Sequence, residues 1–210
     1  SLCPHGKTTM APQLFERQLK DGAWGLTLAT PQQVRIALEY GAKRILLANQ
    51  LADTKAIAWF QHCLDADPEL DLICLVDGLE GVSLLEAVPG GRPFSVLLEL
   101  GRPGGRCGAR DLETALTVAR AVKASKRLRL RGVECYEGIL VSPDTDSDRA
   151  HIEAWLDELG ELARACATED LFETDEVLLS AGGSAYFDLV AARLAAVELG
   201  RPARVLLRSG

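Results

Sequence analysis

The chain has 210 residues, of which 48% are hydrophobic and 25% are charged, a composition typical of a soluble globular protein with one barrel-sized domain or two small ones. Its net charge of −7 argues against a nucleic-acid binder, and the one dense cationic run, residues 123–131, is interpreted as a solvated helix end. No apolar run reaches the roughly 18 residues that a membrane span needs, and six scattered cysteines without a C-x-x-C pair indicate reduced thiols in a cytoplasmic protein.

Short apolar runs rich in β-forming residues recur along the whole chain. They predict eight strands, at residues 2–3 (a stub), 25–29, 44–48, 70–76, 94–100, 129–136, 176–180 and 203–207. The runs ILLA at 45–48 and VLL at 96–98 are continuous rather than alternating. Continuous runs are typical of parallel strands that are buried on both faces.

Seven helices are expected between these strands. Thr30 and Pro31 form a capping hydroxyl and a first-turn proline, and Gly41 follows the far end of the same helix. Asp111 precedes another helix, whose apolar residues share one face, and residues 146–148 open a long one. A helix is also expected to begin near residues 11–12, and the last helix over residues 185–197.

Strands that alternate with helices predict an α/β protein, and we expect a (β/α)8 barrel over residues 1–210. The competing architecture is an open doubly wound sheet. Neither a G-x-G-x-x-G nor a G-x-x-x-x-G-K-[ST] motif follows the first strand, which lowers the odds of a dinucleotide or nucleotide triphosphate site.

Polar side chains stand where the predicted strands end: Lys7, Thr30, Asn49, Asp77, Glu99, Tyr136 and Ser180. In a (β/α)8 barrel the chemistry sits at this end of the strands. Asp77 is interpreted as part of a plain turn and Thr30 as a helix cap, so the convergence of the set carries the argument.

Lys7 lies in the run PHGKTT, residues 4–9, ahead of the first predicted helix. Most lysines are surface residues, but this one has small and β-branched neighbours rather than a charged helix face around it. An amine becomes nucleophilic where desolvation or a nearby cation lowers its pKa, and the mouth of a barrel offers both.

Gly182, Gly183 and Ser184 follow the seventh predicted strand; we call residues 182–184 the glycine loop. Two glycines let the backbone approach a ligand closely, and amides at a helix start favour an anion. The alternative is a plain glycine turn with a serine cap. A lysine amine together with a phosphate cradle suits pyridoxal phosphate above other cofactors.

Two further segments carry candidate residues. Residues 101–110 contain four glycines and three arginines after Glu99, and arginine is a common partner of anionic oxygens, although a solvated loop is equally consistent. By alternation, Glu134 and Tyr136 share a face, so an inward Glu134 would be a buried carboxylate in need of a partner. His5 is the one histidine near the expected site, and no metal-ligand spacing occurs.

The motif PHGKT at residues 4–8 resembles the P-H-x-K-T signature of pyridoxal-phosphate enzymes with the alanine-racemase-like barrel, in the D-serine dehydratase and D-threonine aldolase branch. Segments in matching order extend the resemblance over nearly the whole chain: residues 22–30, 45–49, 105–108, 136–138 and 182–184. The TTM at residues 8–10 is more similar to bacterial D-serine or amino-acid deaminases.

The resemblance implies a catalytic residue, Lys7, and the cofactor-binding residues Lys7, His5, Arg106, Tyr136, Gly182, Gly183 and Ser184. Lys7 would bond to the cofactor aldehyde and move protons at Cα. The glycine loop would hold the phosphate, Tyr136 would face the pyridine nitrogen, and Arg106 would lie near the phenolic oxygen or the substrate carboxylate.

The implied activity is a pyridoxal-phosphate-dependent lyase, a D-serine dehydratase that yields a 2-oxo acid and ammonia. Cleavage of Cα–Cβ in D-threonine-like substrates is the nearest alternative. A non-catalytic pyridoxal-phosphate carrier and a barrel enzyme of phosphorylated metabolites are the other two. The resemblance also implies a homodimer and a C-terminal β-domain with a divalent metal; we expect that domain to be absent and the barrel to be truncated at both ends.

Overall fold

The computed structural model describes residues 1–139 and 145–209, in which strands and helices alternate. The strands are β1 (Leu26–Leu28), β2 (Arg44–Gln50), β3 (Asp71–Val76), β4 (Phe94–Leu100), β5 (Leu128–Cys135), β6 (Val177–Ala181) and β7 (Ala203–Leu207). The helices are α1 (Pro12–Lys20), α2 (Pro31–Glu39), α3 (Thr54–Ala66), α4 (Leu79–Glu86), α5 (Leu112–Ala124), α6 (Thr145–Thr168) and α7 (Phe187–Ala195), with a short 3-10 helix η1 (Glu137–Ile139).

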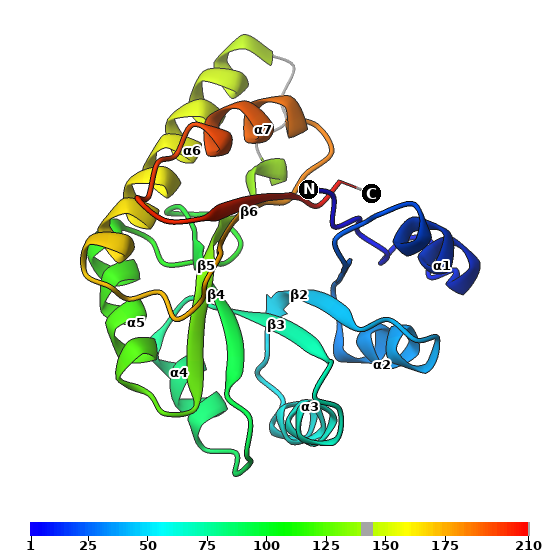
Figure 1. The fold of residues 1–210 in the computed structure, drawn as a ribbon. Helices are drawn as coiled ribbons and strands as arrows, with labels where there is room; N and C mark the ends of the chain where they lie inside the picture. The colour runs from blue at the N-terminus through cyan, green and yellow to red at the C-terminus, as the bar shows by residue number, and fades with distance from the viewer. Residues whose placement is uncertain (140–144, 210) are drawn as a thin grey trace.

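All seven strands run parallel in the order β1 to β7, in a sheet that curls round a central axis with the helices outside it (Figure 1). The α/β class and the parallel sheet are confirmed. The repeated strand-helix-strand connection produces this arrangement, because a parallel neighbour needs a crossover, which a helix supplies. The carboxyl ends of all the strands therefore open to one side.

The predicted eighth strand at residues 2–3 is wrong as a strand. Leu2 makes an isolated bridge to Leu207, and the Cys3 N–H donates to the Leu207 carbonyl at 2.8 Å. On the other side, the Thr27 N–H donates to the Pro4 carbonyl at 2.9 Å. The N-terminal segment thus joins the two edge strands, but Pro4 has no N–H with which to extend a ladder.

Two layers of apolar side chains explain the continuous hydrophobic runs. The larger cluster packs between the sheet and the helices. The smaller one fills the inside of the curled sheet and consists of Cys3, Leu46, Ile73, Leu75, Leu97, Leu178 and Leu206. Neighbouring residues of one strand point to opposite faces, so both clusters require apolar residues in turn.

The predicted helix signals at Thr30 and Asp111 are confirmed. Thr30 Oγ1 accepts a hydrogen bond from the Gln33 N–H at 3.3 Å, and Asp111 Oδ1 accepts one from the Thr114 N–H at 2.7 Å. The last helix differs from the expectation, because it begins at Phe187 rather than at residue 185, which leaves the glycine loop clear of the helix end. Within the described ranges, no helix has the length and apolar character that crossing a membrane requires.

Candidate functional site

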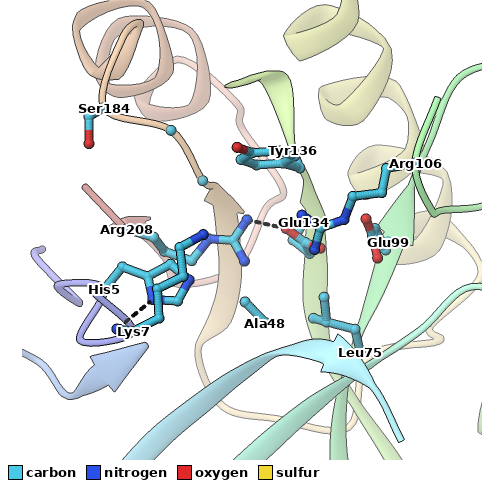
Figure 2. Close-up of a pocket in the computed structure, with 12 residues that line it drawn as sticks. His5, Lys7, Ala48, Leu75, Glu99, Arg106, Glu134, Tyr136, Ser184 and Arg208 are labelled. Carbon is cyan, nitrogen blue, oxygen red and sulfur yellow. Dashed lines mark hydrogen bonds and ion pairs between the residues drawn. The ribbon is translucent and has the colours of Figure 1, made fainter. Parts of the chain in front are cut away.

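A cavity of about 140 Å³ lies where the strands end, inside the curled sheet (Figure 2). Its lining combines five strand-end segments with the N-terminal segment and the glycine loop: His5, Lys7, Ala48, Leu75, Glu99, Arg106, Glu134, Tyr136, Gly182, Gly183, Ser184 and Arg208. All seven residues predicted as site residues line this one cavity. Their convergence is a finding, whereas their chemical roles stay a prediction.

Lys7 stands in the turn that follows the N-terminal segment, with its side chain exposed at the cavity. Gly6 sets the position of this turn, because a Cβ there would lie 2.5 Å from Cε1 of Phe15. The Gly6 N–H also donates to the Thr27 carbonyl at 2.8 Å. The backbone is thus packed tightly beneath α1 and bonded to β1, and the amine of Lys7 is directed from a fixed base.

His5 lies beside Lys7 and accepts a hydrogen bond at Nδ1 from the Lys7 N–H at 3.4 Å (Figure 2). Burial, together with the positive charges of Lys7 and Arg208, lowers the pKa of the His5 imidazole to about 4. At neutral pH the ring is therefore uncharged. A neutral ring can accept at one nitrogen and donate at the other.

Arg208, which the sequence analysis did not single out, lies at the centre of the site (Figure 2). Its Nη2 donates to Oε2 of Glu134 and, at 3.0 Å, to the carbonyl of Cys135. The two side chains are 3% and 1% exposed. Arg208 is thus the partner that the buried Glu134 was predicted to need. The signal that could have revealed it was its place directly after the last strand.

Glu99 is a second buried carboxyl on the cavity wall, at the end of β4. Gln50 donates a hydrogen bond from Nε2 to Oε2 of Glu99. Burial and the negative charge of Glu134 raise the pKa of Glu99 to about 8. A carboxyl of this kind holds its proton at neutral pH and can act as a hydrogen-bond donor inside the cavity.

The arginine-rich loop after β4 places one of its three arginines at the cavity. The guanidinium of Arg106 lies 5.3 Å from the ring centroid of Tyr136, close enough for a cation–π contact. Asp77, interpreted from sequence as a plain turn residue, accepts a hydrogen bond from the Gly108 N–H at 2.9 Å. The end of β3 therefore tethers the loop that carries Arg106.

The glycine loop passes close to the buried charges. The Gly182 N–H donates to Oε2 of Glu137 at 2.9 Å, and the Gly183 carbonyl accepts from Oγ of Ser209 at 3.0 Å. A Cβ on Gly182 would stand 2.4 Å from Nη2 of Arg208. A side chain at position 182 would therefore displace the Arg208 guanidinium, and the Gly182 amide, expected to face a ligand, is already engaged by Glu137.

Comparison with known proteins gives one family over most of the chain. The family described as alanine racemase, N-terminal domain, matches residues 5–202. The 3-hydroxy-D-aspartate aldolase of Paracoccus denitrificans (strain Pd 1222) is 26% identical over 191 residues, which cover 88% of this chain and 48% of that protein. The chain spans about half the length of the curated relatives that it matches.

Solved structures share the fold. D-threonine aldolase from Filomicrobium marinum superposes with a TM-score of 0.82 at 22% identity, over 100% of this chain and 53% of that one. D-threo-3-hydroxyaspartate dehydratase from Delftia sp. HT23 gives 0.67 at 23%, over 99% and 52%. PipY of Synechococcus elongatus PCC7942, solved with pyridoxal phosphate bound, gives 0.69 at 14%, over 99% and 90%. The fold is thus one that binds pyridoxal phosphate in a solved neighbour.

Proposed function

The chain belongs to the alanine racemase N-terminal domain family, and from that premise we propose that it is the barrel domain of a pyridoxal-phosphate-dependent lyase acting on D-3-hydroxy amino acids. The observation that carries the proposal is the convergence of Lys7, Tyr136 and the glycine loop on one cavity at the strand ends. These groups come from distant parts of the sequence, and each would have a function in holding such a cofactor.

The residues present fit this cofactor. Lys7 offers an amine at one side of the cavity, and Gly182 and Gly183 of the glycine loop offer backbone without side chains at another. Arg208 Nε is buried and has no hydrogen-bond partner among the described residues, so the cavity wall has an unused hydrogen-bond donor. Its guanidinium and that of Arg106 supply positive charge for an anionic ligand.

In the proposed mechanism, the Lys7 amine would hold the cofactor aldehyde and would later carry a proton to or from the substrate Cα. The glycine loop would hold the phosphate, and Tyr136 would lie near the pyridine. Arg106 would bind the phenolic oxygen or the substrate carboxylate. When bound, the cofactor supplies the electron sink for bond cleavage at Cα.

Our leading reaction is loss of water from D-serine to an enamine, which one water molecule then hydrolyses to pyruvate and ammonia, as the TTM at residues 8–10 suggests. The second candidate is Cα–Cβ cleavage, which the names of the Paracoccus and Filomicrobium relatives support equally well. A non-catalytic pyridoxal-phosphate carrier is the third candidate, and PipY, which shares the fold, was solved with pyridoxal phosphate bound. We further propose a homodimer, and a divalent metal held outside the described cavity.

One assay separates these candidates. The full-length protein, supplied with pyridoxal phosphate, is incubated with D-serine and with D-threonine, and pyruvate, 2-oxobutyrate and glycine are scored separately. Pyruvate from D-serine supports the dehydratase, and glycine from D-threonine supports the aldolase. Cofactor uptake without any product supports the carrier.

The cofactor itself has its own test. Borohydride reduction followed by peptide mapping should label Lys7, and Lys7→Ala should remove the visible absorbance of the bound cofactor. Lys20→Ala, which removes an exposed lysine at the far end of α1, is the matched control and should keep both signals. A label on another peptide, or none, would overturn the proposal.

A further inference from the structure

Glu137 is a buried carboxyl that has no role in the proposed mechanism. It opens η1 directly after Tyr136, and its side chain has no exposed surface. Oε2 accepts the Gly182 N–H at 2.9 Å. Oε1 is also buried, but it has no hydrogen-bond partner within the described part of the chain. A buried polar atom without a partner is costly, so its retention calls for a reason.

The unpaired oxygen faces the glycine loop. A Cβ built on Gly183 would lie 2.7 Å from Oε1 of Glu137, and 3.3 Å from Cα of Gly138. Glu137 therefore lies against the glycine loop: Oε2 bonds to the Gly182 amide, and Oε1 occupies the space that a Cβ of residue 183 would need. An anion held by that loop would thus have this carboxyl on the other side of the loop backbone.

The charges around Glu137 do not provide it with a cation of its own. Arg208, directly after β7, is the positive group whose charge acts on Glu137, but its guanidinium is paired with Glu134 on β5. Glu134 and the buried Cys135 also face Glu137 from β5, and from the loop side it meets the Gly182 amide. Burial raises the pKa of the Glu137 carboxyl above its ordinary value, which makes its uncharged form easier to reach than that of an exposed glutamate.

We propose that Glu137 is a positioning residue of the glycine loop and that its ionisation controls how strongly the loop binds a phosphate group. When neutral, Glu137 accepts the Gly182 N–H through Oε2 and keeps its proton on Oε1, so the loop is held without a negative charge behind it. When ionised, it repels the phosphate at short range. The inference rests on the proposed function, since it takes the phosphate of pyridoxal phosphate as the ligand.

The test compares two ligands that differ at one end. Pyridoxal phosphate and pyridoxal share the aldehyde but only the first has a phosphate, so their affinity ratio isolates the phosphate end. The ratio is measured on the full chain from about pH 5 to about pH 9, a range that brackets a raised carboxyl pKa. The variants are Glu137→Gln, which is uncharged with the same shape, and Glu137→Ala; Glu113→Gln, exposed on α5, is the control.

In Glu137→Gln the ratio should follow only the titration of the phosphate itself, whose second pKa is ≈ 6. Relative to this variant, the wild-type ratio should fall at least about tenfold with rising pH, the effect of about one pKa unit of coupling. Glu113→Gln should behave as the wild type. Glu137→Ala should bind pyridoxal phosphate more weakly at every pH, because the Gly182 amide loses its acceptor.

Equal ratios in wild type and Glu137→Gln across the range would overturn the inference while leaving the proposed function intact. Failure of the wild type to bind either ligand would overturn the proposed function, and the inference with it. Circular dichroism and thermal melts of each variant check the fold. If Glu137→Ala does not fold, the comparison of wild type with Glu137→Gln still decides.

Discussion

Arg208 and Glu134 form an ion pair that is almost completely buried, with side-chain exposures of 3% and 1%, at the base of the candidate site. The two residues stand at the ends of β7 and β5, and β6 lies between these strands. The pair therefore connects parts of the chain 74 residues apart and places one positive and one negative group in the wall of the cavity. Removing one member leaves the other charge in the interior without compensation.

Arg208→Met should destabilise the protein by about 3–5 kcal/mol, the usual cost of breaking a buried ion pair. The double variant Arg208→Met with Glu134→Leu should recover much of the loss, because no isolated charge remains. The measurement is the free energy of unfolding in urea. Arg204→Met is the matched control: Arg204 lies on β7, and losing its partly exposed ion pair with Glu176, which directly precedes β6, should cost at most about 1 kcal/mol. A loss no larger in Arg208→Met than in this control would contradict the argument.

Gly183→Ala should weaken binding of pyridoxal phosphate by about tenfold, and Gly183→Asp by more, because the new Cβ meets Glu137 at 2.7 Å and the aspartate adds an anion. The affinity is measured by absorbance titration. Gly81→Ala, in α4, places its Cβ in open space and should instead stabilise its helix by up to about 1 kcal/mol. Unchanged affinity in Gly183→Asp would remove the glycine loop from the site.

Glu99 should make the protein less stable as the pH rises. Its pKa is 4.5 in the reference state and about 8 in the folded chain, so between these values the folded state holds a proton that the unfolded state has lost. The contribution is complete below about pH 4.5 and is lost as the pH approaches 8. Glu99→Gln should flatten this decline and raise the stability at pH 8. Parallel pH profiles of stability for wild type and variant would disprove the shift.

His5 should make the protein less stable as the pH falls, whereas Glu99 does so as the pH rises. Its pKa falls from 6.5 to about 4 on folding, so between these values the unfolded state binds the extra proton. The stability that neutral His5 contributes is complete above pH 6.5 and declines as the pH falls towards 4. His5→Gln should reduce this loss in unfolding experiments between these limits. His62→Gln, which changes an exposed histidine of α3, should follow the wild type; a matching effect there would show that His5 is not special.

Much of the fold could be predicted because its signals are local. The continuous aliphatic run at 45–48 predicted a strand buried on both faces, and β2 has this burial on either side of the sheet. Thr30 with Pro31 marked a helix start within one turn of sequence, and the cap is present. The rule that polar residues at strand ends meet at one mouth also brought Lys7, Glu99 and Tyr136 together.

The expectations that failed concerned contacts between distant segments. Residues 2–3 have the composition of a strand but pair through isolated bridges. The last helix was predicted to begin at residue 185, but α7 begins at Phe187. The glycine loop before it is held instead by hydrogen bonds to Glu137 and Ser209. The neighbouring residues could not predict the isolated pairing of residues 2–3 or the later helix start, because each depends on a hydrogen-bond partner elsewhere in the chain.

The sequence by itself determined the parallel α/β class, the helix caps and the set of polar residues at the strand ends, because apolar periodicity, capping hydroxyls and turn glycines act over a few residues. Only the tertiary structure decided that Arg208 neutralises Glu134, that Glu99 is buried enough to hold a proton, and that Glu137 occupies the Gly182 amide. These three facts concern burial and charge. Both depend on which side chains surround a group in space, and curling of the sheet brings those neighbours from strands far apart in the chain.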